Sequence, residues 1–227
     1  MPPRLLSLLA ILVCIFNPVR AGDVKLTPTG FAIDAGTAGI HTLSYPKLLN
    51  PNDGGLKPEN ITLKEDGGGV TMTYSPSGKL VISKQADGGW LFHFTEIPPD
   101  RVKFAFSVPL PLSVIEEGAR WSFDGQPAKP FPAEKGKKAA IQLANPSSFV
   151  FQKGTAGFTL TYIDHRKTFT MFLDNRVYGK SSFSLGHILY FPGKKHVPEI
   201  DYSLKIDASL PSAAAPAPAP APTAPAM

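Results

Sequence analysis

Residues 157–191, GFTLTYIDHRKTFTMFLDNRVYGKSSFSLGHILYF, decide the fold class of this chain. Apolar residues occupy every second position in three segments, and two charged loops, 164–167 and 174–180, separate these segments. This period of two is typical of antiparallel strands with one buried face. The stretch therefore predicts a three-stranded meander. Its apolar face is predicted to carry Phe158, Leu160 and Tyr162, then Phe169, Met171 and Leu173, then Phe183, Leu185 and His187.

The same alternation recurs along most of residues 24–208, with turns rich in Gly, Pro and Asp between the runs. Its clearest example is 102–110, where the apolar residues alternate with Lys103, Ala105 and Ser107. Pro109 and Pro111 predict a sheet edge at the end of this strand, because proline has no N–H to donate. Many short strands and almost no helical pattern predict an all-β fold. We expect a single antiparallel β-sandwich, jelly-roll-like or related, over residues 22–210.

The two ends of the chain differ from this domain in composition. Residues 1–21 combine a cationic start, an apolar run and small residues at 19 and 21, which predicts a secretory signal peptide cleaved before Gly22. Lipidation at Cys14 is disfavoured, because Val13 stands where a lipobox has a small residue. We expect a periplasmic or extracellular protein with no membrane span after cleavage. Residues 211–227 form an Ala/Pro-rich tract, which predicts a disordered, extended tail.

Removal of the signal peptide leaves a mature chain without cysteine, so disulfides and thiol chemistry are excluded. It also removes two of the 23 basic residues and none of the 18 acidic ones, which lowers the net charge from +5 to +3. That charge is too small to argue for nucleic acid as a partner. Basic clusters at 135–138 and 194–196 are interpreted either as soluble hairpin tips or as a patch for an acidic polysaccharide.

The sequence offers little for catalysis. The paired carboxylates at 116–117 are neighbours on the chain, and neighbours on an extended strand point to opposite faces, which does not suit a glycosidase. The bases and cations that a polysaccharide lyase needs occur in the loops 164–167 and 174–180. A strand of six residues would hold these loops roughly 20 Å apart. No spacing of a serine nucleophile elbow or of a zinc site is present. We therefore predict no catalytic residue, no metal and no cofactor.

Binding is the better-supported prediction. The loop that begins at Asp174 holds a carboxylate, an amide, a guanidinium and a phenol, the groups that would bind sugar hydroxyls. Aromatic residues outside the predicted apolar face, such as Phe172, would add surfaces on which sugar rings stack. The alternative for Phe172 is that the second sheet buries it. The other alternative is that Asp174 and Arg176 pair with each other and only stabilise the turn. The candidate ligand-binding residues are Asp174, Asn175, Arg176, Tyr178, Tyr190 and, at an expected exposed rim, Trp90.

The segments WSFDG at 121–125 and LDNR at 173–176, together with the signal peptide and the all-β pattern, give the chain a family resemblance. It resembles the β-sandwich accessory, carbohydrate-binding-like domains of secreted bacterial glycan-degrading proteins. The resemblance covers most of residues 24–208. It implies an exported, non-catalytic module that binds carbohydrate or another cell-surface partner, with a polysaccharide or cell-envelope glycan as ligand. A polysaccharide-active enzyme and a structural envelope protein remain the alternatives.

Overall fold

The computed structural model describes residues 22–115, 118–163 and 168–210. The predictions for the signal peptide, for the carboxylates at 116–117, for the loop at 164–167 and for the Ala/Pro tail lie outside the described residues. The all-β prediction is confirmed. Within the described residues, helix is limited to α1 (Leu112–Ile115) and three 3₁₀ turns, η1 (Gly36–Ala38), η2 (Asn175–Tyr178) and η3 (Pro192–Lys194). In the part of the chain that the structure describes, no helix has the length and apolar character to cross a membrane.

The strands of these three described ranges form three sheets, and every strand pairing among them is antiparallel. The first sheet has the order β1 (Val24–Thr27), β2 (Gly30–Asp34), β3 (Ile40–Ser44). The six-stranded sheet has the order β13 (Ala140–Ala144), β16 (Thr168–Asp174), β17 (Ser182–Tyr190), β10 (Lys103–Pro111), β4 (Lys47–Leu49), β5 (Gly55–Leu56). The nine-stranded sheet has the order β12 (Lys129–Pro130), β11 (Arg120–Phe123), β14 (Ser148–Lys153), β15 (Ala156–Tyr162), β18 (Ile200–Asp207), β9 (Trp90–Thr95), β8 (Lys79–Lys84), β7 (Gly69–Thr73), β6 (Glu59–Leu63).

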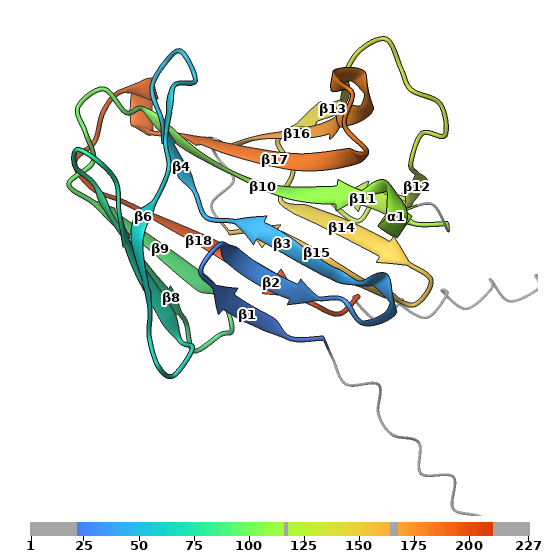
Figure 1. Cartoon of the computed structure of the whole chain (residues 1–227), viewed down its shortest axis with the longest axis horizontal. Coiled ribbons are helices and arrows are strands. Elements are labelled where there is room, and N and C mark those ends of the chain that lie inside the picture. Colours follow the sequence, from blue (N-terminus) through green and yellow to red (C-terminus); the bar gives the residue numbers. More distant parts are fainter. Residues whose placement is uncertain (1–21, 116–117, 164–167, 211–227) are drawn as a thin grey trace, which may run out of the picture.

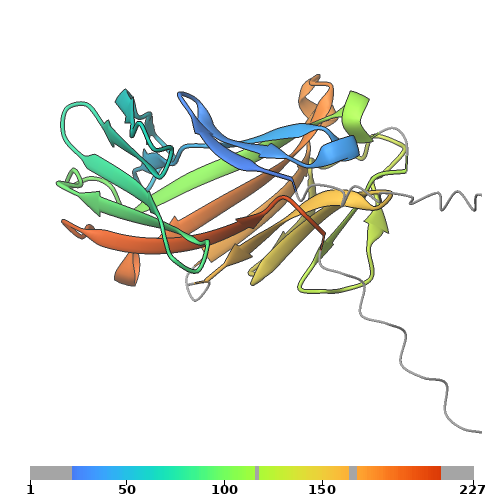
Figure 2. The ribbon, with the colours of Figure 1, turned by 90° about the horizontal axis from the view of Figure 1, so that it is seen from below.

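These sheets make two layers (Figures 1 and 2). The nine-stranded sheet is one layer, and the other two sheets lie side by side in the second layer. The amide of Ser107 on β10 donates to Ser44 Oγ on β3 at 3.0 Å, which joins the two sheets of the second layer. The pairing of β10 with β4 stops at Ala105, so among the described residues Pro109 and Pro111 pair only with β17. Their position agrees with the predicted sheet edge.

Aromatic side chains fill the space between the layers. Phe104 on β10 stacks on Phe94 of β9 with 4.8 Å between ring centroids, and it meets Tyr202 of β18 edge-on at 5.3 Å. These rings come from both layers and are almost completely buried. Burial of one such ring stabilises the fold by about 2–3 kcal/mol. The described residues contain no cysteine, so no disulfide contributes there, and the apolar core holds the sandwich together.

The predicted inward face of the central meander is right for two strands and wrong for β16. The predicted side chains of the strands around 158–162 and 183–187 are buried. On β16 the buried residues are instead Thr168, Thr170, Phe172 and Asp174, and Phe169, Met171 and Leu173 lie half-buried on the outer face. The pairing with β17 fixes this register, because Phe172 faces the buried Leu185. A one-residue change of register exchanges the two faces of a strand.

Candidate functional site

Asp174 and Arg176 form an ion pair at the turn where β16 ends. Asp174 Oδ1 accepts hydrogen bonds from the amide and Nε of Arg176 at 3.0 and 2.9 Å, and Oδ2 accepts from Nη2 at 2.9 Å. Asp174 is 2% exposed. The hydrogen bonds from Arg176 lower the pKa of the Asp174 carboxyl, and those from Asp174 raise the pKa of the guanidinium. Both groups are therefore charged at neutral pH.

The same guanidinium fastens a distant loop to this turn. Arg176 Nη1 donates to the carbonyl of Ala133 at 2.9 Å, and Nη2 donates to the carbonyls of Pro132 and Glu134 at 2.9 and 3.0 Å. Its plane lies over the ring of Phe183, 4.7 Å from the centroid. Every nitrogen of the guanidinium thus has a partner within the protein. These contacts agree with the alternative interpretation of the sequence, in which Asp174 and Arg176 pair with each other and stabilise the turn.

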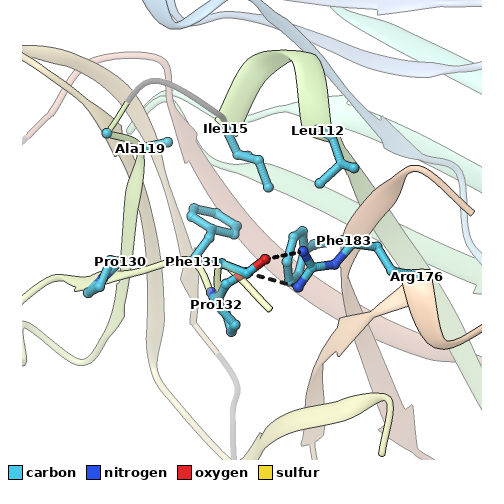
Figure 3. A pocket seen from close by; sticks show the side chains of 10 residues that line it. Leu112, Ile115, Ala119, Pro130, Phe131, Pro132, Arg176 and Phe183 are labelled. Atoms are coloured by element: carbon cyan, nitrogen blue, oxygen red, sulfur yellow. Dashed lines mark hydrogen bonds between the residues drawn. The ribbon is translucent and has the colours of Figure 1, made fainter. Parts of the chain in front are cut away.

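An open hollow lies beside this turn (Figure 3). Its volume is about 370 Å³. It lies between α1 on one side and the loop fastened by Arg176 on the other, with Phe131 and Phe183 between them. The lining is mostly apolar: Leu112, Ile115, Gly118, Ala119, Pro130, Phe131, Pro132, Ala133, Arg176 and Phe183.

Two further predicted residues lie in the same turn, η2. Asn175 Nδ2 donates to Ser182 Oγ at 3.4 Å, which links the start of η2 to the start of β17. Tyr178 is 67% exposed, so its ring is free to contact a ligand. The structure thus brings Asp174, Asn175, Arg176 and Tyr178 together at one end of the sandwich. Only Arg176 of these four lines the hollow.

Tyr190 lies at the opposite end of β17. The strand runs from Ser182 to Tyr190, which corresponds to about 26 Å of extended chain. The ammonium groups of Lys103 and Lys194 each lie 5.2 Å from the centroid of the Tyr190 ring. Tyr190 therefore belongs to a separate surface, and no small ligand reaches both it and Tyr178.

The expectation that Trp90 lies at an exposed rim is wrong. Trp90 is 2% exposed, and Phe31 of β2 packs edge-on against it at 5.0 Å between centroids. The reason is register: Trp90 begins the inward row of β9 that continues with Phe92 and Phe94. The ring therefore belongs to the core and offers no face for stacking on a sugar.

His187 is a neutral histidine of the core. Its Nδ1 lies 2.9 Å from Thr170 Oγ1, its Nε2 lies 3.1 Å from Tyr202 Oη, and its ring stacks on Tyr162 at 4.0 Å between centroids. Burial lowers the pKa of His187 to about 3. This confirms the predicted hydrogen-bonded histidine. Among the described residues, no group of three or more His, Cys, Asp or Glu side chains is placed to hold a metal.

Sequence reasoning missed the apolar walls of the hollow and the outward position of Phe169. Phe131 and Ala133 belong to a Pro- and Lys-rich loop with no periodic pattern, so nothing in their sequence placed them beside Arg176. For Phe169 the signal was present but ambiguous, because residues 168–174 contain apolar side chains in both registers.

Comparisons with known proteins show similarity to solved structures but not to a protein family. No protein-family model matches the chain, and no curated protein matches it either. A solved structure entitled a GH31 family sulfoquinovosidase from E. rectale in complex with the aza-sugar inhibitor IFGSQ is similar to it, with a TM-score of 0.46 and 8% sequence identity. The match covers 82% of this chain and 32% of that enzyme. A likeness this distant is no argument about function.

Proposed function

We propose that the protein is an exported, non-catalytic carbohydrate-binding module and that a neutral sugar occupies the hollow beside Arg176. The observation that carries this proposal is the hollow itself, an open depression of about 370 Å³ with mostly apolar walls next to a polar turn. Its volume falls within the roughly 300–1,000 Å³ that is usual for small-molecule sites.

The chemistry of the walls suits a pyranose. One face of such a ring carries C–H groups, which pack on aromatic and aliphatic surfaces such as Phe131, Leu112 and Ile115. The hydroxyl edge would stay in the open mouth, in contact with water. Arg176 serves as part of the wall and holds the loop in place, because Asp174 and three loop carbonyls already occupy its nitrogens. A neutral sugar therefore fits this site better than an acidic one.

A glycan array with the mature chain, residues 22–227, tests the function as a whole. We expect binding to at least one neutral glycan, without release of reducing ends or of unsaturated product. Released product would favour a polysaccharide-active enzyme. A chain that binds no neutral glycan on the array would refute this proposal, and one that binds no glycan at all would favour the structural envelope protein.

The substitution Ala133→Trp tests the location. Ala133 is exposed and lines the hollow, so an indole at this position fills the space without disturbing the core. We expect the affinity for the bound glycan to fall at least about tenfold, the loss of roughly 1.4 kcal/mol. Glu134→Trp is the matched control, because Glu134 is the next residue, is exposed and does not line the hollow. Equal affinities for the two variants, with unchanged melting temperatures, would place the ligand elsewhere.

A further inference from the structure

The outer face of the six-stranded sheet is apolar and aromatic over β16 and β17. Phe169 and Ile188 are directly opposite on this face, and Tyr190 follows two residues along β17. Phe169 and Tyr190 are half-buried, and Ile188 is 9% exposed. The register carries the same face onward, because Ile188 is opposite Ala105 and Ala105 is opposite Lys47. This surface crosses the four strands β16, β17, β10 and β4, from Phe169 to Lys47, and is about 14 Å wide.

The nine-stranded sheet has a different outer face. Its outward residues are mainly hydroxyl-bearing or charged, for example Thr71, Ser83, His93, Thr161, Ser203 and Lys205. Contact with water is sufficient to explain polar side chains on this outer face, and no binding partner is needed. The six-stranded and nine-stranded sheets therefore differ in their outer faces, and an apolar outer surface can mark an interaction site.

Cations surround the Tyr190 ring. Lys103 is opposite Tyr190 in the strand pairing, and its ammonium lies 5.2 Å from the ring centroid and 2.6 Å from Asp53 Oδ1. Lys103 is only 4% exposed, so its ammonium group interacts with Asp53 and with the Tyr190 ring and is not available to a ligand. These contacts fix the position of the ring. Lys194, from the turn after β17, approaches the same ring at 5.2 Å and is exposed.

Three of the cations on this outer face are exposed to solvent. Lys47, Lys194 and Lys195 are all exposed, and within the described ranges none of them has a carboxylate partner. His196 Nε2 lies 2.8 Å from the carbonyl oxygen of Ile97, which helps to hold the turn that carries the two later lysines. Uncompensated positive charge next to aromatic side chains is complementary to a ligand that is anionic and also has apolar ring faces.

We propose that this face binds an acidic polysaccharide, with sugar rings against Phe169 and Tyr190 and with carboxylate or sulfate groups beside Lys194 and Lys47. Ammonium groups bind such anions through charge-assisted hydrogen bonds. The surface is separate from the hollow, since β17 lies between them. This inference and the proposed function both concern a carbohydrate ligand, but they place it at different surfaces. Binding at one surface can be absent while binding at the other is present. A glycan is favoured over nucleic acid because the mature chain carries few excess cations.

The test uses the mature chain, residues 22–227, and two polymers with one backbone, dextran sulfate and unmodified dextran, with polygalacturonate as the uronate probe. We expect salt-sensitive binding to at least one of the two acidic polymers and no comparable binding to dextran. The double variant Lys194→Glu, Lys195→Glu is expected to lower that affinity at least about tenfold. Binding of any neutral glycan in the hollow is expected to be unchanged.

The matched control is Lys135→Glu, Lys137→Glu in the other basic cluster, which changes the net charge by the same amount. This control is expected to keep its affinity within about twofold, because its lysines lie outside the aromatic face. An equal loss in the two double variants would show unspecific attraction and would overturn the proposal. So would an oligonucleotide bound as tightly as the acidic glycans, or no binding to either acidic polymer. Tyr190→Ser, which leaves the charge unchanged, is expected to weaken binding several-fold.

Discussion

The single residue Arg176 links the turn after β16 to the loop around Ala133, which lies more than 40 residues earlier in the chain. Its partner Asp174 is buried and charged, so loss of the guanidinium would leave an anion without a partner away from water. The sequence offered two interpretations of this pair, a ligand site and a structural turn. The contacts favour the second for Arg176, and Tyr178 is the residue of the turn that remains open to a ligand.

Arg176→Ala is expected to destabilise the fold by about 2–4 kcal/mol at neutral pH, because it leaves Asp174 unpaired and frees the loop beside the hollow. For a domain of this size the melting temperature should fall by roughly 5–15 °C. Tyr178→Ala is the control and should change it little. Adding Asp174→Asn to Arg176→Ala should recover part of the loss. A variant as stable as the wild type would contradict a structural role for the ion pair.

His187 makes a separate prediction about pH. Burial lowers its pKa to about 3, whereas the unfolded chain has a value of about 6.5, so below that pH the unfolded state binds a proton that the folded state does not. The fold therefore loses up to about 1.4 kcal/mol per pH unit through this group as the pH falls from 6.5 towards 3. Stability from His187 is fully present above pH 6.5.

Urea unfolding of the wild type and of His187→Gln at several pH values between 8 and 4 measures this effect. The variant should be less stable at pH 8, since the packing and hydrogen bonds of the imidazole change, but its stability should decline less steeply below pH 6.5. His41, whose pKa is also lowered by burial, is present in both proteins, so the difference isolates His187. Parallel curves for the two proteins would show that His187 does not set the acid sensitivity.

Among the elements, β16 shows how register selects the residues that lie in the core and those that lie on the outer face. The register with β17 places Phe172 in the core and Met171 outside, opposite Gly186. Phe172→Ala is therefore expected to destabilise the protein by about 3–5 kcal/mol, the cost of a large cavity in a packed core. Met171→Ala, its neighbour on the outer face, should cost less than about 1 kcal/mol. Chemical unfolding distinguishes the two. The reverse order of costs would restore the register predicted from sequence.

At the scale of the whole molecule, the sandwich separates two surfaces of different chemistry. The hollow has apolar walls and an arginine whose charge is internally paired, whereas the outer face around Tyr190 has exposed lysines without carboxylate partners in the described part of the chain. A single β-strand, β17, runs between these surfaces and holds them at a fixed distance. A long polysaccharide with neutral and acidic stretches is the kind of ligand that such an arrangement could contact twice.

The fold class could be predicted from the sequence, because the alternation of apolar and polar residues is a local property of each strand. The sequence also identified the turn from Asp174 to Tyr178 as polar and aromatic, and the core histidine at 187. It did not determine the inward face of β16, since Thr170 and Phe172 compete with Phe169 and Met171 and only the pairing with β17 selects between them.

The surroundings of the candidate residues follow from the tertiary structure and could not be predicted from the sequence. The tertiary structure buried Trp90 against Phe31, from a strand about 60 residues earlier in the chain, and it placed the loop around Ala133 against Arg176. It also brought Lys194 and Lys103 to the ring of Tyr190. Except for Lys194 and Tyr190, which are four residues apart, these contacts join residues more than 40 positions apart in sequence. Strand pairing, hydrogen bonds and side-chain packing in the folded protein set them, and no local pattern encodes them.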